Sequence, residues 1–68
     1  MKPARLQEIV LGLLGSGTRP RPRTAAELLG EIQAAGHPVL MYDVLYALLE
    51  LQRARRVWQD AEGKWTTA

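Results

Sequence analysis

Few side chains in this 68-residue chain are suited to covalent or metal chemistry. There is no cysteine, one histidine (His37) and one serine (Ser16), too few ligands for a zinc site built by protein alone. Asp43 and Glu50 lie seven residues apart, which on a helix is two turns or about 10 Å, near the carboxylate spacing of inverting glycosidases. Carboxylates on an exposed helix face are far more often solvated, and a histidine before a proline is most often a turn residue. The sequence therefore predicts no enzyme, no metal and no cofactor.

Basic residues gather in two places instead. The segment 18–23 alternates arginine with proline and contains Arg19, Arg21 and Arg23. The second cluster is Arg53, Arg55 and Arg56, and Lys64 stands apart from both, nearer the C-terminal end. Proline stiffens the first segment and like charges repel, so an extended basic loop is predicted. It is either a solvated connector or an arm that contacts phosphates. A net charge of +2 and a pI near 9.5 permit a nucleic-acid partner without requiring one.

The apolar residues predict three helices, over residues 4–14, 25–35 and 40–53. Thr24 and Glu27 form a capping box at the start of the second helix, in which each backbone N–H donates to the other side chain. Gly36 is suited to the left-handed stop that ends this helix, and Pro38 prevents its continuation. The capping box, Gly36 and Pro38 together predict a helix, a turn and a second helix.

Residues 56–60 and 64–67 are expected to pair as an antiparallel hairpin. Aromatic and β-branched residues favour strands, and Gly63 supplies the turn between them. A hairpin alone is marginal, so it must pack on the helices, with Trp58 or Trp65 closing one end of the core. The expected core is Leu6, Ile9, Val10, Leu13, Leu28, Leu29, Ile32, Val44, Leu48, Leu51 and Val57. The fold class is α+β, a small winged helix of three helices followed by a two-stranded wing.

Length and composition set further bounds. A chain of 68 residues forms one domain, here residues 1–68, and its single core is only marginally stabilising. The absence of cysteine gives no sign of an oxidising compartment. No apolar run approaches the roughly 20 residues of a membrane span, and the N-terminus has no signal-peptide pattern. The expected location is the cytoplasm.

The stretches Thr24–Leu29, Ala34–Val39 and Val44–Val57 resemble the N-terminal DNA-binding domain of the ferric-uptake-regulator family. That family shows an S/T-x-E-E-L helix, then G-H-x-V-S-x-A-T-V-Y-R-T-L along its recognition helix, then E-A-G-L-V before its wing. The apolar frame matches at Val39, Val44, Leu48, Leu51, Ala54 and Val57. The resemblance covers about half the chain and implies a winged helix that binds DNA as a transcription regulator or repressor.

Departures from the family pattern fall on the DNA-contacting positions. The family's capping serine is Leu40 here, and its Ala-Thr pair is Tyr42 and Asp43. Its DNA-touching Tyr-Arg pair is Leu45 and Tyr46, and its glycine after the helix is Arg55. No metal ligand of the family can be transferred to this sequence, because the metal-sensing part has no counterpart in it.

Two functions follow from these features. In the first, helix 40–53 lies in the major groove of double-stranded DNA, and the seven cations named above contact the phosphates of the duplex. In the second, the winged helix contacts protein, either a second copy or another partner. Both hypotheses use the outer face of this helix, whose residues would face the bases of DNA in the first and form the protein interface in the second. These residues are Tyr42, Asp43, Leu45, Tyr46 and Leu49. This face lacks the usual base readers Arg, Lys, Asn and Gln. If exposed, such an apolar patch marks an interface; the other interpretation is that the first helix or the wing covers it within one molecule. The sequence favours DNA, and protein contact is the alternative.

Overall fold

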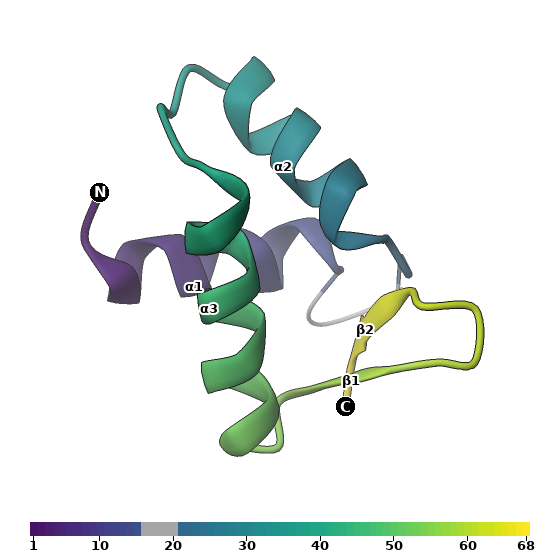
Figure 1. The fold of residues 1–68 in the computed structure, drawn as a ribbon. Helices are drawn as coiled ribbons and strands as arrows, with labels where there is room; N and C mark the ends of the chain where they lie inside the picture. Colours follow the sequence, from purple (N-terminus) through teal and green to yellow (C-terminus); the bar gives the residue numbers. More distant parts are fainter. Residues whose placement is uncertain (16–20) are drawn as a thin grey trace.

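The computed structural model describes residues 1–15 and 21–68, which form three helices followed by a two-stranded antiparallel hairpin (Figure 1). The elements are α1 (Pro3–Leu13), α2 (Ala25–Ala34), α3 (Met41–Arg53), β1 (Val57–Gln59) and β2 (Trp65–Thr67). The helix order, the hairpin and the α+β class are those predicted, and the topology is compatible with a winged helix. None of the described helices is long and apolar enough to cross a membrane.

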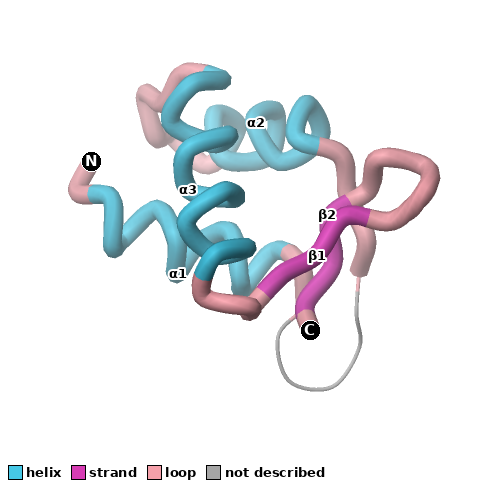
Figure 2. Tube along the Cα trace, turned by 60° about the horizontal axis from the view of Figure 1, so that its bottom comes forward, coloured by secondary structure: helices cyan, strands magenta, loops and turns pink. Residues whose placement is uncertain are grey.

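Helix α3 lies at the centre of the arrangement. It packs across α1 and against α2, and its C-terminal end leads directly into β1. Figure 2 shows the hairpin beside that end of α3, on the side of the molecule away from the N-terminus. One face of α3 therefore supplies the middle of the core, while no element of residues 1–15 and 21–68 covers the opposite face.

Local signals explain where α2 begins and ends. The Glu27 N–H donates to Thr24 Oγ1 at 3.1 Å and the Thr24 N–H donates to Glu27 Oε1 at 3.0 Å, which confirms the predicted capping box. These hydrogen bonds, the one from the Thr24 backbone above all, lower the pKa of Glu27. Gly36 takes a φ of +94° after the last turn, as its predicted role requires.

Helix α3 ends in the same way without a glycine. The Arg56 N–H donates to the Leu51 carbonyl at 2.9 Å and the Arg55 N–H donates to the Gln52 carbonyl at 2.9 Å. This pair of bonds is a Schellman motif, whose C′ residue must be left-handed. Arg55 occupies that position with a φ of 59°. The ferric-uptake-regulator pattern, which this sequence resembles, has glycine there.

The hairpin gains a third segment from the loop before α2. Strands β1 and β2 pair with Val57 opposite Thr67 and Gln59 opposite Trp65. Arg23 joins the far edge of β2, because its N–H donates to the Trp65 carbonyl at 3.0 Å and its carbonyl accepts from the Trp65 N–H at 2.7 Å. Trp65 is therefore the tryptophan that closes the core, whereas the side chain of Trp58 is half exposed.

The core lies where α1, α2, α3 and the hairpin meet. Eight of its predicted residues are buried: Leu6, Val10, Leu28, Ile32, Val44, Leu48, Leu51 and Val57. Three predicted core residues are only partly buried: Ile9, Leu13 and Leu29. The buried core also includes Leu11, Leu14, Val39, Ala47 and Trp65. The buried side of α1 is thus rotated toward Leu11 and Leu14, because α2 and α3 both cover it.

Leu40 lies outside the core despite its helical spacing. It stands one turn before the buried Val44, a spacing that favours the core side of a helix, yet it is 65% exposed. It is the N-cap, with an extended backbone at φ −108° and ψ 165°, so the helical wheel does not apply to it. The Asp43 carboxylate accepts from its N–H at 2.9 Å and closes the first turn.

Candidate interaction surface on helix α3

An apolar stripe runs along the outer face of α3. It consists of Tyr42, Leu45, Tyr46 and Leu49, which we call the α3 stripe. These residues follow the spacing i, i+3, i+4 and i+7, which places them on one side of a helix. All four are exposed, from 40% for Leu45 to 83% for Tyr42. The residues suspected of forming an interface therefore do lie together on one open surface.

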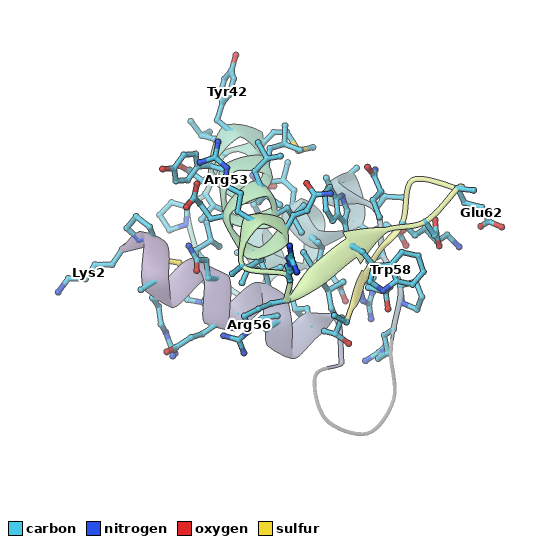
Figure 3. All side chains as sticks on the ribbon, turned by 90° about the horizontal axis from the view of Figure 1, so that it is seen from below. Lys2, Tyr42, Arg53, Arg56, Trp58 and Glu62 are labelled. Carbon is cyan, nitrogen blue, oxygen red and sulfur yellow. The ribbon has the colours of Figure 1, made fainter. Side chains whose placement is uncertain are left out.

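The α3 stripe has opposite charges at its two ends. Asp43 lies beside its first turn, where it also caps the helix. Arg53 lies in the last turn of α3 and continues the line of the stripe, since it is eleven residues, or about three turns, beyond Tyr42. Figure 3 shows Tyr42 and Arg53 on the same outer side of α3, whereas Arg56 lies on the other side of that helix end.

A pocket of about 130 Å³ adjoins the stripe at Tyr46. Pro3 and Leu6 of α1 form one side of it, and Val39 and Ala47 form another. It is partly open to solvent, its exposed wall is about half polar and half apolar, and it continues the surface of α3 toward the start of α1. No sequence pattern indicates this pocket, because its walls come from segments that are far apart along the chain.

The described members of the predicted phosphate-contacting set come from the loop before α2, the end of α3, the turn after it and the wing. Arg21, Arg55 and Arg56 are exposed and make no ion pair within residues 1–15 and 21–68. Arg53 pairs with Glu50 at 3.2 Å, and Lys64 lies 3.7 Å from Glu62 in the wing turn. Figure 3 places Glu62 at the far tip of the wing, so this tip is acidic as well as basic. Arg19 lies outside the described residues.

Arg23 points inward, unlike the other predicted phosphate contacts among residues 21–68. Its Nη1 lies 2.7 Å from Glu31 Oε2, and its Nε donates to the Leu13 carbonyl at 3.3 Å. Its side chain is only 15% exposed, against 37% for that of Glu31. The Glu31 oxygen is buried without an aligned hydrogen bond, so the contact is a close pairing of charges. Arg23 thus joins α1, α2 and β2 and is poorly placed for a phosphate.

The described residues offer little else for chemistry. No three His, Cys, Asp or Glu side chains gather among them. Asp43 caps its helix and Glu50 pairs with Arg53, so both carboxylates have structural partners. The arrangement on α3 is suited to burying apolar surface and orienting charges at its ends.

Comparisons with protein-family models, with curated proteins and with solved structures each gave no match to this chain.

Proposed function

We propose that this winged helix is a protein-contact module that binds through the α3 stripe. The observation that carries the proposal is the exposure of four large apolar side chains in line on one helix face. A patch of this kind on a small domain is usually covered by a partner. Two of the four are tyrosines, which are enriched in the buried centres of interfaces.

Covering the stripe removes apolar side-chain area from water, which favours association. Each Å² of apolar area that an exposed Leu or Tyr removes from water stabilises the complex by about 25 cal/mol. The tyrosine hydroxyls remain free to hydrogen-bond at the rim, since an aromatic ring with a polar tip suits a surface that is wet at its edge. The pocket beside Tyr46 adds a concave area into which a partner side chain can pack.

A site-specific crosslink tests this proposal. A photoreactive phenylalanine replaces Tyr46 in the chain expressed in its own cells, and Glu8, exposed on α1, is replaced in the same way as the matched control. The expected result is a protein adduct at position 46, identified by mass spectrometry, that is absent at position 8. Equal or absent crosslinking at the two positions rejects the proposal.

DNA binding is the second candidate, and the exposed Arg55 and Arg56 favour it. They lie between α3 and β1, where a winged helix brings its helix and wing toward a duplex. The resemblance to the DNA-binding domain of the ferric-uptake-regulator family supports the same idea. Against it stand Asp43 and the apolar α3 stripe, which offer few groups for reading base edges.

Titration with mixed-sequence duplex DNA at two salt concentrations tests the second candidate. If Arg55 and Arg56 bind phosphates, replacing both with Ala flattens the dependence of log K on log salt by about 0.9 for each phosphate that is no longer neutralised. Lys2, exposed near the N-terminus and far from Arg56 in Figure 3, provides a control substitution with no expected change. Amide spectra that stay unchanged with excess duplex at low salt remove this candidate.

A further inference from the structure

We infer that the partner of the α3 stripe is a second copy of this chain, packed with the two α3 helices antiparallel. This inference rests on the proposed protein contact and names its occupant. A two-fold axis near the middle of the stripe, between Tyr46 and Leu49, brings the Tyr46 of one copy against the Leu49 of the other. Each Tyr42 then meets the partner's Arg53. Such a contact is isologous, and it closes after two copies.

The distribution of charge selects the antiparallel direction. Asp43 lies at the start of the stripe. Arg53 lies in its last turn, where it pairs with Glu50 of its own copy at 3.2 Å while its side chain stays 79% exposed. In an antiparallel pair each Arg53 approaches the Asp43 of the other copy, and opposite charges meet twice. A parallel pair sets each charge beside its own kind. The helix dipoles act in the same direction, because the positive N-terminus of one helix lies beside the negative C-terminus of the other.

The exposure of the end residues supports the same pairing. Tyr42 is the most exposed of the four stripe residues, and the Arg53 side chain is 79% exposed. In the single copy the Tyr42 ring projects away from the rest of the molecule (Figure 3). In the antiparallel pair the partner's guanidinium lies over this ring, an arrangement that aromatic rings and arginine favour. The two ends of the stripe are therefore complementary to each other.

Sedimentation equilibrium from low micromolar to millimolar protein measures the self-association. A monomer–dimer equilibrium is expected, and Tyr46→Ala is expected to weaken it at least about tenfold. The matched control is Trp58→Ala, which removes a half-exposed aromatic residue from the hairpin and leaves the dimer constant unchanged. A wild-type chain that stays monomeric at millimolar concentration overturns the inference.

Charge reversal tests the direction of packing. Asp43→Lys and Arg53→Glu each create two repulsive contacts in the antiparallel dimer, so each variant alone is expected to dimerise about tenfold more weakly or worse. Mixing the two variants restores opposite charges at both contacts, and a heterodimer is expected. A mixture that associates no better than the separate variants overturns the antiparallel arrangement.

Asp43→Lys also removes a cap, because Asp43 accepts from the Leu40 N–H. A second variant avoids this difficulty. Asp43→Asn keeps an oxygen acceptor, and adding it to Arg53→Glu removes the new repulsion, so the double variant is expected to dimerise more tightly than Arg53→Glu alone. No recovery in this double variant counts against the pairing of residues 43 and 53.

The crosslinking and sedimentation results together distinguish self-association from contact with a different protein. An adduct between two copies at position 46 agrees with the second copy as partner. An adduct with a different protein, together with a monomeric wild-type chain, overturns self-association and leaves protein contact through the α3 stripe in place. The absence of any specific adduct at position 46, with a monomeric chain, rejects both.

Discussion

Arg23 connects three parts of the chain through one side chain and one backbone position. Replacing it with Ala leaves Glu31 Oε2 buried without its cation and removes the donor to the Leu13 carbonyl. We expect a loss of about 1–3 kcal/mol in the free energy of unfolding, the usual penalty for a buried group deprived of its partner. Denaturant unfolding followed by circular dichroism measures it.

Arg5 provides the matched control for Arg23. Its pair with Glu8 at 3.4 Å is exposed on both sides, so Arg5→Ala is expected to change stability by less than about 0.5 kcal/mol. Equal effects of the two substitutions would contradict an inward, structural Arg23. The sequence could not separate Arg23 from Arg21, because both alternate with proline. The two arginines differ because Glu31 of α2 lies beside Arg23 in the folded domain.

Arg55 occupies a backbone conformation that favours glycine. Its φ of 59° is left-handed, and the Schellman bonds at the end of α3 hold it there. Arg55→Gly is expected to raise the free energy of unfolding by about 0.5–1 kcal/mol, since relief of the left-handed strain outweighs the extra freedom of glycine in the unfolded chain.

Gly36 is the converse of Arg55, because here a glycine occupies the left-handed position and the substitution adds a side chain. It has a φ of +94°, and a Cβ there would meet no atom within 4 Å, so its substitution acts through backbone conformation alone. Gly36→Ala is expected to lower the free energy of unfolding by about 1 kcal/mol. If both substitutions destabilise the domain, the arginine side chain makes a contribution at position 55 that exceeds the strain.

At the scale of elements, helices α2 and α3 were predictable because their signals are local. The Thr24 and Glu27 capping box and Gly36 each act within a few residues, and they predict both ends of α2 to within one residue. Features that depend on contacts between elements were not predictable. The choice between Trp58 and Trp65 needed the strand register, and the buried side of α1 needed the positions of α2 and α3.

Helix α3 has two sides with opposite roles, and adjacent leucines distinguish them. Leu48 is fully buried, whereas Leu49 is half exposed in the α3 stripe. Leu48→Ala is expected to lower the free energy of unfolding by about 2–5 kcal/mol. Leu49→Ala, the matched control measured on dilute protein, is expected to cost well under half as much. Similar losses at the two positions would show that the stripe is not a free surface.

The capping box of α2 makes a small contribution that depends on pH. The Thr24 hydrogen bonds lower the pKa of Glu27 in the folded state. The contribution is therefore present above the ordinary pKa of a glutamate and is lost as the pH falls through the lowered folded value. Glu27→Gln keeps an acceptor without a titrating charge, so its melting temperature should depend less on pH across this acidic range. Parallel melting curves for the two proteins would contradict this assignment.

At the scale of the whole molecule, the sequence supplied the candidate surface but not its surroundings. The helical wheel placed Tyr42, Leu45, Tyr46 and Leu49 together, as the structure does. It could not show that α1, α2 and the hairpin all leave that face open, because this depends on how four elements pack. The inward orientation of Arg23 and the exposure of the α3 stripe likewise depend on contacts between elements, so neither could be read from the sequence pattern.

Self-association makes the melting temperature of the whole domain depend on protein concentration. A partner that binds only the folded state adds RT ln(1 + [L]/Kd) to stability. For a domain of this size each kcal/mol gained raises the melting temperature by about 4–8 °C. The wild-type chain should therefore melt at progressively higher temperature from micromolar to millimolar concentration, and Tyr46→Ala should melt at a nearly constant temperature.

The comparison at low concentration decides how this result is interpreted. Tyr46 is exposed in the single copy, so Tyr46→Ala and the wild-type chain should melt at similar temperatures when dilute and diverge as concentration rises. A constant difference at every concentration would mean that Tyr46 stabilises the monomer itself. A wild-type melting temperature that does not move over this range would mean that the α3 stripe faces solvent or a different protein, because binding of a second folded copy must shift the unfolding equilibrium.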